Sequence, residues 1–319
     1  MNILVTGTLG YDYIMDFQGL FAERIMPERV HNLSLSFLVD SLKKQRGGTA
    51  GNIAHSLHLL GNEALILSAA GNDFGPYQKE LERLYISTKG ISIHKEVATG
   101  SYFVITDKED NQIGSFYVGA SIYNKDISLS SYLQPKQKNG ASSFVIVSPN
   151  TPESMKKYVA VCIELNTPFM YDPAFQIGSL DQKDLRLGIK HAAIVIGNDY
   201  EIGLMEERLE VSHEELIALS GILITTLGSR GSIIETMKDA IHIKPAKPKK
   251  VLDPTGAGDA YRSGFISGYL QKFDLETCGR MGSVAAVYTV EAYGTQTHTY
   301  TVKDFCTRYK ENFHDSLTL

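Results

Sequence analysis

A glycine-rich turn that runs into a helical pattern is the stretch of this sequence best suited to chemistry. It reads Asp253-Pro-Thr-Gly-Ala-Gly-Asp259. Gly256 and Gly258 have no Cβ, so a ligand can approach the backbone closely. The first amides of a helix have no intrahelical partner and lie at the positive end of the helix dipole. The Gly256, Ala257 and Gly258 backbone would therefore form a hole for an anion such as a phosphoryl group in transfer.

The acidic residue at the end of this turn has two interpretations. Asp259 could accept the proton of an attacking hydroxyl, as a general base does. It could instead cap the helix, because Asp is a favoured N-cap residue. For an isolated Gly-x-Gly-Asp the capping interpretation would be favoured, since short motifs often match by chance. The remainder of the chain shifts the balance toward the base.

Length and composition limit the classes of function. The chain has 319 residues, 43% of them hydrophobic and 21% charged, with a net charge of −5. This is an ordinary globular composition, and the Pro-interrupted run Lys244–Lys250 is too short for a nucleic-acid surface. Cys162, Cys278 and Cys306 show no CxxC spacing, which predicts a reduced, cytoplasmic protein. The N-terminus does not read as a signal peptide, and no apolar run reaches membrane-spanning length, so neither nucleic acid nor membrane is an expected partner.

The elements that must position the turn alternate between strand-like and helix-like patterns. Continuous apolar runs predict buried strands at Ile3–Thr6, Ala64–Ser68, Phe144–Ser148, Phe169–Asp172, Ala193–Ile196 and Ile222–Thr226. Helical patterns fall at Ala50–Leu60, Tyr77–Leu84, Pro152–Leu165, Gln182–Ile189, Tyr200–Glu206 and His213–Leu219, and three more follow Asp259. The alternation predicts a doubly wound α/β fold whose mostly parallel sheet is flanked by helices. Ligands of such folds bind beyond the carboxyl ends of the strands.

Two segments alternate apolar and polar residues instead, which indicates strands with one dry and one wet face. They are His31–Val39 and the hairpin pattern Thr99–Val118. With Tyr11–Phe17 they could form a small separate sheet over the main one. We therefore expect a single domain over residues 1–319 with lid strands from about 11–17, 31–40 and 99–118. A hairpin at the edge of the main sheet is the alternative.

A second glycine cluster, Arg46-Gly-Gly-Thr-Ala-Gly-Asn52, lies about 200 residues before the first. In this order and spacing the two clusters resemble the two signatures of the ribokinase-like (PfkB) kinase family, and the resemblance covers essentially the whole chain. Further stretches are similar to the bacterial, ribokinase-like adenosine kinases, which are homodimers that phosphorylate the adenosine 5′-hydroxyl. These stretches are Val5–Gly7, Ser34–Asp40, Ser115–Gly119, Asn198–Glu201, Thr225–Gly228 and Gly294–Gln296.

The resemblance implies a set of acceptor-binding residues. Asp12 would hold the ribose 2′- and 3′-hydroxyls, with Gly48 and Asn52 beside it. Tyr102 and Phe116 would stack on the purine. The base pocket would be lined by Thr8, which stands where those enzymes often have a Ser, and by Ser36, with Gln176 nearby. Taken singly, each aromatic residue would more often be sheet core.

The resemblance also implies a nucleotide side. Glu201 would hold Mg²⁺ through water, and Asn198 precedes it at the helix start. A helix N-terminus with an acidic first turn is the alternative there. The residues Thr226, Gly228 and Gly231 would carry ATP. Relatives often also depend on a monovalent cation such as K⁺ near the glycine-rich turn.

These inferences describe an ATP-dependent kinase that phosphorylates the adenosine 5′-hydroxyl to give AMP and ADP, acting as a homodimer joined through the lid. The other phosphate-binding motifs, the P-loop and the protein-kinase set, do not occur in the sequence. Two alternatives stay open. One is a kinase for another nucleoside or for a free sugar such as ribose or fructose, and the other is a non-catalytic binding protein on the same fold.

Overall fold

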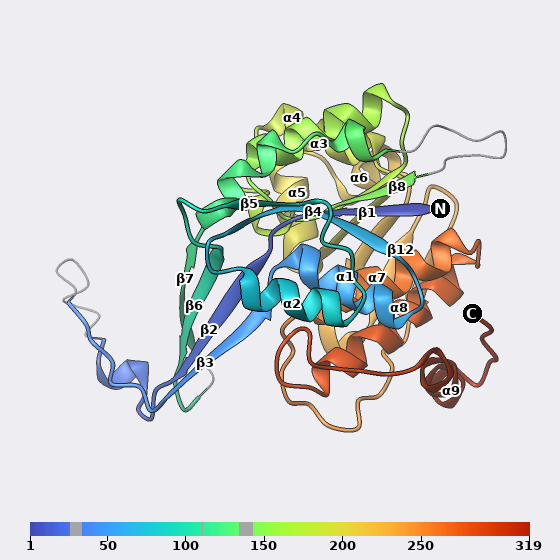
Figure 1. The fold of residues 1–319 in the computed structure, drawn as a ribbon. Helices are drawn as coiled ribbons and strands as arrows, with labels where there is room; N and C mark the ends of the chain where they lie inside the picture. The colour runs from blue at the N-terminus through green and yellow to red at the C-terminus, as the bar shows by residue number, and fades with distance from the viewer. Residues whose placement is uncertain (26–33, 110, 134–142) are drawn as a thin grey trace.

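The computed structural model describes residues 1–25, 34–109, 111–133 and 143–319, and its main body is a sheet covered by helices on both faces (Figure 1). Within these ranges the sheet has nine strands in the order β13-β12-β11-β10-β9-β8-β1-β4-β5. The strands are β1 (Asn2–Thr6), β4 (Ala64–Gly71), β5 (Ile91–His94), β8 (Ser143–Val147), β9 (Phe169–Tyr171), β10 (Ile194–Asn198), β11 (Leu223–Thr226), β12 (Ser232–Glu235) and β13 (Ala240–Ile243). From β5 to β11 all neighbours are parallel, whereas β12 and β13 are antiparallel. The predicted mostly parallel α/β sheet is confirmed.

The helices lie on two faces, as the continuous apolar strands require. Successive residues of β1 point to opposite faces: Ile3 and Val5 belong to one core cluster and Leu4 to another. The first cluster packs under α1, α2, α7 and α8, and the second under α3 to α6 (Figure 1). The helices are α1 (Thr49–Leu59), α2 (Gly75–Arg83), α3 (Pro152–Glu164), α4 (Gln182–His191), α5 (Asp199–Leu209), α6 (His213–Leu219), α7 (Ala257–Leu270), α8 (Leu275–Val290) and α9 (Val302–Phe313).

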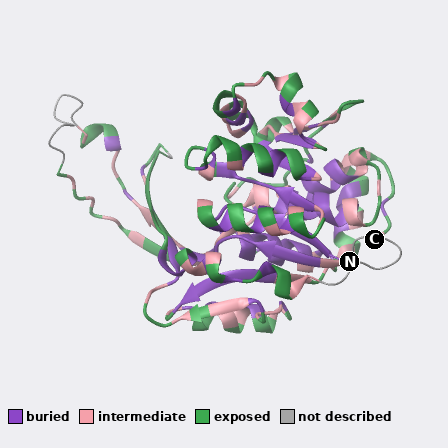
Figure 2. Ribbon diagram, turned by 90° about the horizontal axis from the view of Figure 1, so that it is seen from above, coloured by how far each residue is buried: buried purple, intermediate pink, exposed green. Residues whose placement is uncertain are grey.

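A smaller, separate sheet extends from the carboxyl-end side of the main sheet as the lid. Its order is β3-β2-β6-β7, with β2 at Gly10–Asp16, β3 at Ser41–Gly47, β6 at Gly100–Thr106 and β7 at Gln112–Tyr117. The central sheet is mostly buried, whereas every described residue of β7 is exposed (Figure 2). The lid is therefore thin and open compared with the main body.

The lid strand predicted at 31–40 is wrong in position. Residues 31–33 lie outside the described ranges, residues 34–39 have no regular structure, and the third lid strand is β3 at Ser41–Gly47. Burial still alternates along 34–39, and the half-buried Phe37 packs on the rings of Phe17 and Phe21. The partner strand β2 already ends opposite Ser41, so the preceding residues have no strand to pair with.

Candidate active site

The glycine-rich turn forms the N-terminus of α7. Gly256 is the N-cap with φ 79°, a conformation that favours glycine. The Ala257 amide donates to the Pro254 carbonyl at 3.2 Å, so it is occupied within the turn. The amides of Gly258 and Asp259 have no hydrogen-bond partner among the described residues. These two amides, at the positive end of the helix, can therefore receive an anion.

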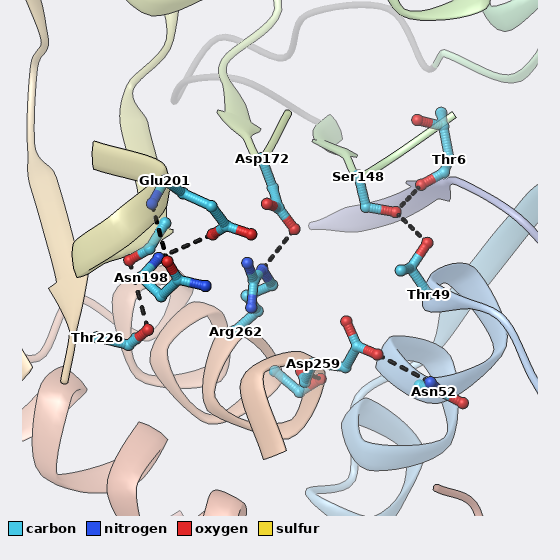
Figure 3. Close-up of polar contacts among 12 residues, drawn as sticks. Thr6, Thr49, Asn52, Ser148, Asp172, Asn198, Glu201, Thr226, Asp259 and Arg262 are labelled. Atoms are coloured by element: carbon cyan, nitrogen blue, oxygen red, sulfur yellow. Dashed lines mark hydrogen bonds and ion pairs between the residues drawn. The ribbon is translucent and has the colours of Figure 1, made fainter. Parts of the chain in front are cut away.

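Asp259 does not cap the helix. It is the third residue of α7, and its Oδ2 accepts a hydrogen bond of 2.8 Å from Nδ2 of Asn52 in α1 (Figure 3). Burial raises the pKa of Asp259 to about 6, while Arg262 and the Asn52 hydrogen bond oppose the rise. The carboxylate is thus largely ionised at neutral pH, with a proton affinity close to that of a working general base. Its Oδ1 is not held by Asn52.

A buried ion pair lies beside this carboxylate, and the sequence analysis missed it. Arg262, one turn further along α7, places Nε 2.6 Å from Oδ2 of Asp172, which follows β9. Their side chains are 9% and 1% exposed. A Cβ on Gly258 would come within 2.7 Å of the guanidinium, so this glycine leaves room for the charge beside the anion site. Burial raises the pKa of Glu201, and the charge of Arg262 opposes that rise. One buried cation therefore faces three carboxylates (Figure 3).

The predicted nucleotide residues meet at the ends of β10 and β11. Asn198 and Glu201 form a capping box at the start of α5: each side chain accepts the other's amide at 2.8 Å. Thr226 lies beside Asn198 in register and donates to the Gly197 carbonyl at 3.4 Å. The helix-capping interpretation of this motif is thus realised, and it engages only one Glu201 oxygen, Oε2.

The two loop glycines after β11 differ in their surroundings. A Cβ on Gly228 would meet open space, whereas one on Gly231 would come within 2.0 Å of the Ile243 carbonyl. Gly231 therefore closes the loop against β13, and Gly228 leaves the loop surface free.

Three predicted acceptor residues form one row across the lid. Asp12 on β2 is in register with Tyr102 on β6, which is in register with Phe116 on β7. Residues in register share a face of a sheet. Burial raises the pKa of Asp12 to about 6, with further contributions from Asp253 and Asp259. The row therefore faces the α7 turn, with its carboxylate nearest the turn and its two aromatic rings further out.

Glycines shape the root of the lid. A Cβ on Gly47 would come within 2.3 Å of Asp12, and Gly48, at φ 86°, lies against the Thr8 carbonyl. Thr8 is buried at this junction, where its carbonyl accepts the Ala50 amide at 3.1 Å. Thr8, Gly48, Asn52 and Asp12 thus lie at one place, as their predicted roles require.

The remaining two predicted residues lie on segments outside the lid strands. Ser36 is exposed in the irregular segment 34–39. Gln176 ends a short 3-10 turn, Ala174–Gln176, after β9. The neighbour of Gln176 was missed: Phe175 is 63% exposed and its ring centroid is 6.4 Å from that of Phe116. In the sequence, the one feature that could have identified Phe175 is an aromatic residue shortly after a predicted strand end.

The described part of the chain holds no group of three or more His, Cys, Asp or Glu residues placed to bind a metal ion. Within the same ranges, no helix has the length and apolar character needed to cross a bilayer. The site is thus a carboxylate beside two free amides and a buried guanidinium, with an acidic and aromatic row opposite. Such an arrangement can accept a proton from a hydroxyl group. At the same time it can hold the anionic group that the hydroxyl oxygen attacks.

The chain is similar to known kinases over nearly its full length. The family described as pfkB family carbohydrate kinase matches residues 11–301. A nucleoside kinase of Methanocaldococcus jannaschii is 32% identical over 299 residues, which cover 93% of this chain and 93% of that enzyme. The structure of Burkholderia thailandensis nucleoside kinase in complex with inosine has a TM-score of 0.89 at 30% identity, covering 98% of this chain and 99% of that one. The same enzyme in complex with ADP-inosine gives a TM-score of 0.86 at 30% identity, with 98% and 97% covered.

Proposed function

This chain belongs to the pfkB family of carbohydrate kinases, and from that premise we propose that it phosphorylates the 5′-hydroxyl of a nucleoside, adenosine foremost. It is an ATP-dependent phosphotransferase of the ribokinase-like fold whose acceptor is a nucleoside or a sugar. The row Asp12, Tyr102 and Phe116, facing Asp259, is the observation that carries the choice of a nucleoside. A carboxylate suits a ribose diol, and two aromatic rings suit a flat base.

The reaction assigns each group a task. The acceptor hydroxyl would lie by Oδ1 of Asp259, because Oδ2 is held by Asn52. As the hydroxyl oxygen forms its bond to the γ-phosphorus of ATP, its proton passes to Asp259 and the bond from that phosphorus to the β-phosphate oxygen breaks. The Gly258 and Asp259 amides and the Arg262 guanidinium would stabilise the charge on the transferring group. Phosphoryl transfer depends mainly on such positioning and electrostatics.

Magnesium fits this site as a hydrated ion. The described residues offer no three-ligand cluster, but Mg²⁺ retains water and binds mainly to the phosphates of the nucleotide. Glu201 has one oxygen outside the capping box that would hold water of the ion's shell. When bound, Mg²⁺ neutralises phosphate charge.

A requirement for K⁺ is a separate proposal, drawn from the family resemblance. Replacing K⁺ by tetramethylammonium in the assay tests it.

We also propose a homodimer joined through the outer lid face. That face carries Lys44, Tyr13, Phe103 and Ser115 in one row, and the rings of Tyr13 and Phe103 stack at 4.7 Å. Phe103 remains 39% exposed, and an apolar open sheet is usually covered by a partner. Light scattering at micromolar protein should give the dimer mass, and a monomer would contradict the proposal.

We place the reaction in the cytoplasm, since the cysteines are free thiols.

A second acceptor class is favoured by one comparison. The similar Burkholderia enzyme has been solved with inosine, so inosine is the first alternative to adenosine. A free sugar would leave the aromatic ends of the row unused. Sugar phosphates lack an evident partner, because Asp12 is the charged side chain of the row and is an acid.

An ATP-consumption assay over a panel of acceptors tests the proposed function. Adenosine and inosine should be turned over far faster than ribose, fructose or fructose 6-phosphate. A thermal-shift series with the same compounds should show the largest rise in melting temperature for the best acceptor, by mass action. Faster turnover of a sugar or sugar phosphate than of every nucleoside would refute the nucleoside assignment.

A further inference from the structure

The loop at residues 293–297 contacts both the glycine-rich turn and the root of the lid, although none of the functional roles above includes it. The Gly294 amide donates to Oδ2 of Asp253 in the glycine-rich turn at 3.0 Å. Thr295 Oγ1 donates to the Arg46 carbonyl of β3, and Arg46 in return donates to the Gln296 carbonyl. The loop is therefore fastened both to the anion site and to the root of the lid.

The side chain of Gln296 continues this connection inside the protein. It is 3% exposed, and its Nε2 donates to Oδ1 of Asn52 at 2.9 Å. The same Nε2 donates to the hydroxyl of Tyr77, a fully buried residue of α2. Tyr77 in turn donates to the carbonyl of Gly47, where β3 leaves the lid. A string of hydrogen bonds thus joins the lid root to Asn52.

Gly51, from the second glycine cluster, leaves the space for this string. A Cβ at this position would come within 2.0 Å of the Tyr77 hydroxyl and 2.8 Å of Nε2 of Gln296. The glycine therefore serves the contact between these two side chains, which explains a motif residue that ligand binding alone does not require.

The direction of every bond in the string is determined by its two ends. The Gly47 carbonyl and the Asp259 carboxylate can only accept, so Tyr77 must donate to one and Asn52 to the other. With the Tyr77 proton so placed, its oxygen accepts from the Gln296 amide, and that amide also holds Oδ1 of Asn52. Without Gln296, the Asn52 carboxamide could rotate and turn its oxygen toward Asp259, which would repel the carboxylate.

We propose that Gln296 is a positioning residue for phosphoryl transfer: its side-chain amide orients Asn52, and through Asn52 it holds the Asp259 carboxylate in register with the lid root. The proposal rests on the proposed function, in which Asp259 accepts the acceptor's proton. Gln296 touches neither acceptor nor nucleotide in this scheme. Its effect passes through Asn52, and that indirect route is open to test.

A double-mutant cycle between Gln296→Met and Asn52→Ala tests the proposal. Met keeps the size of the side chain and removes its donors. In the wild-type background we expect kcat to fall about 10-fold or more, since small misplacements of reacting groups are costly, with the KM for ATP unchanged. In the Asn52→Ala background the same substitution should lower kcat less than about 2-fold, because residues that act as one unit are not additive.

Asn62→Leu is the matched control. Asn62 Nδ2 donates to Ser267 Oγ of α7 at 2.9 Å, so its loss also removes an amide contact to α7, away from the site. It should lower the melting temperature and leave kcat as in the wild type. If Gln296→Met does not fold, the cycle is run with Gln296→Ala, which leaves room for water.

Equal losses of kcat from Gln296→Met in both backgrounds, or no loss in the wild type, would overturn the positioning role. The cycle uses whichever acceptor the wild type phosphorylates. A wild type that accepts only sugars would end the nucleoside assignment but still give the cycle a result. The two proposals therefore fail separately.

Discussion

The reactive end and the acceptor end of this site are built in opposite ways. At the α7 turn, a hydrogen bond joins Asp259 to Asn52, and a buried ion pair joins Arg262 to Asp172. On the lid, the residues Tyr102 and Phe116 are 37% and 45% exposed. The reactive end at the α7 turn is held in place without a ligand. The acceptor end on the lid has exposed aromatic surface that a ligand could cover.

This difference separates the two tasks of a kinase. Groups that stabilise developing charge work best when they need no reorganisation during reaction. Groups that admit and release an acceptor must open, and a lid of thin sheet can do so. Substitutions at the first end should therefore change kcat and stability, and substitutions at the second should change KM.

Asp259→Asn should have the largest effect on the reaction. An amide cannot take up a proton at neutral pH, so kcat should fall by about 10²–10⁴-fold, the usual contribution of a general base. Acceptor binding, held by the lid row, should change little. Steady-state kinetics with a parallel binding measurement checks both. Near-normal turnover with a lowered melting temperature would make Asp259 a purely structural residue.

Arg262→Met tests whether the reactive end is held by its buried charge. Removing one partner of a buried ion pair costs about 3–5 kcal/mol of folding stability, because the other charge remains unpaired. Arg230→Met is the matched control: its pair with Asp199 is 68% and 56% exposed, and such surface pairs contribute about 0–1 kcal/mol. Chemical denaturation of both variants gives the comparison. Equal losses would mean that the buried pair does not stabilise the site.

Phe116→Ala probes the acceptor end. Loss of a stacking ring should raise the KM for adenosine about 5-fold or more, since an aromatic stack on a base contributes about 1–3 kcal/mol. The kcat should stay within about 2-fold of the wild type. Phe103→Ala removes a similarly exposed ring from the other face of the lid, and its KM should be unchanged. Equal KM values for the two variants would show that Phe116 does not contact the base of the acceptor.

Asp12→Asn should raise the KM for the acceptor, because Asp12 would hold the ribose diol, and its effect on folding should be the smallest of the four variants, a gain in stability. The pKa of Asp12 is raised from 3.8 to about 6, so the folded state holds its proton more tightly than the unfolded state. Stability is therefore lost as pH rises from about 4 to 6, and the loss is complete above 6. The variant should melt a few degrees higher than the wild type at pH 7.5. The gain should vanish at pH 3.5, and a lower melting temperature at pH 7.5 would contradict it.

The sequence predicted the glycine-rich turn at a helix start because its signals are local. Gly256, Gly258 and Asp259 lie within four residues, and the apolar runs that became β1, β8 and β10 need no partner to be recognised. The short strands β5, β12 and β13 were not predicted. They have only four residues each and are partly exposed, so their apolar pattern is weak.

The errors fall where partners are distant in sequence. The pairing of Arg262 with Asp172 spans 90 residues, and in a helical pattern an Arg reads as surface. On the lid, residues 34–39 alternate in burial without forming a strand, and Phe37 among them packs on Phe17. The strand β3 begins at Ser41 because its partner β2 ends opposite that residue. This boundary depends on β2 and cannot be recognised in the sequence of residues 34–39.

Identification of the product of adenosine phosphorylation tests the central claim most directly. After incubation with ATP, Mg²⁺ and adenosine, ³¹P and ¹H NMR should show one new phosphate monoester on the 5′ oxygen, with an equal amount of ADP. That result would place a primary nucleoside hydroxyl beside Asp259. Phosphate on the 2′ or 3′ oxygen, or ADP formed without a nucleotide product, would contradict the account.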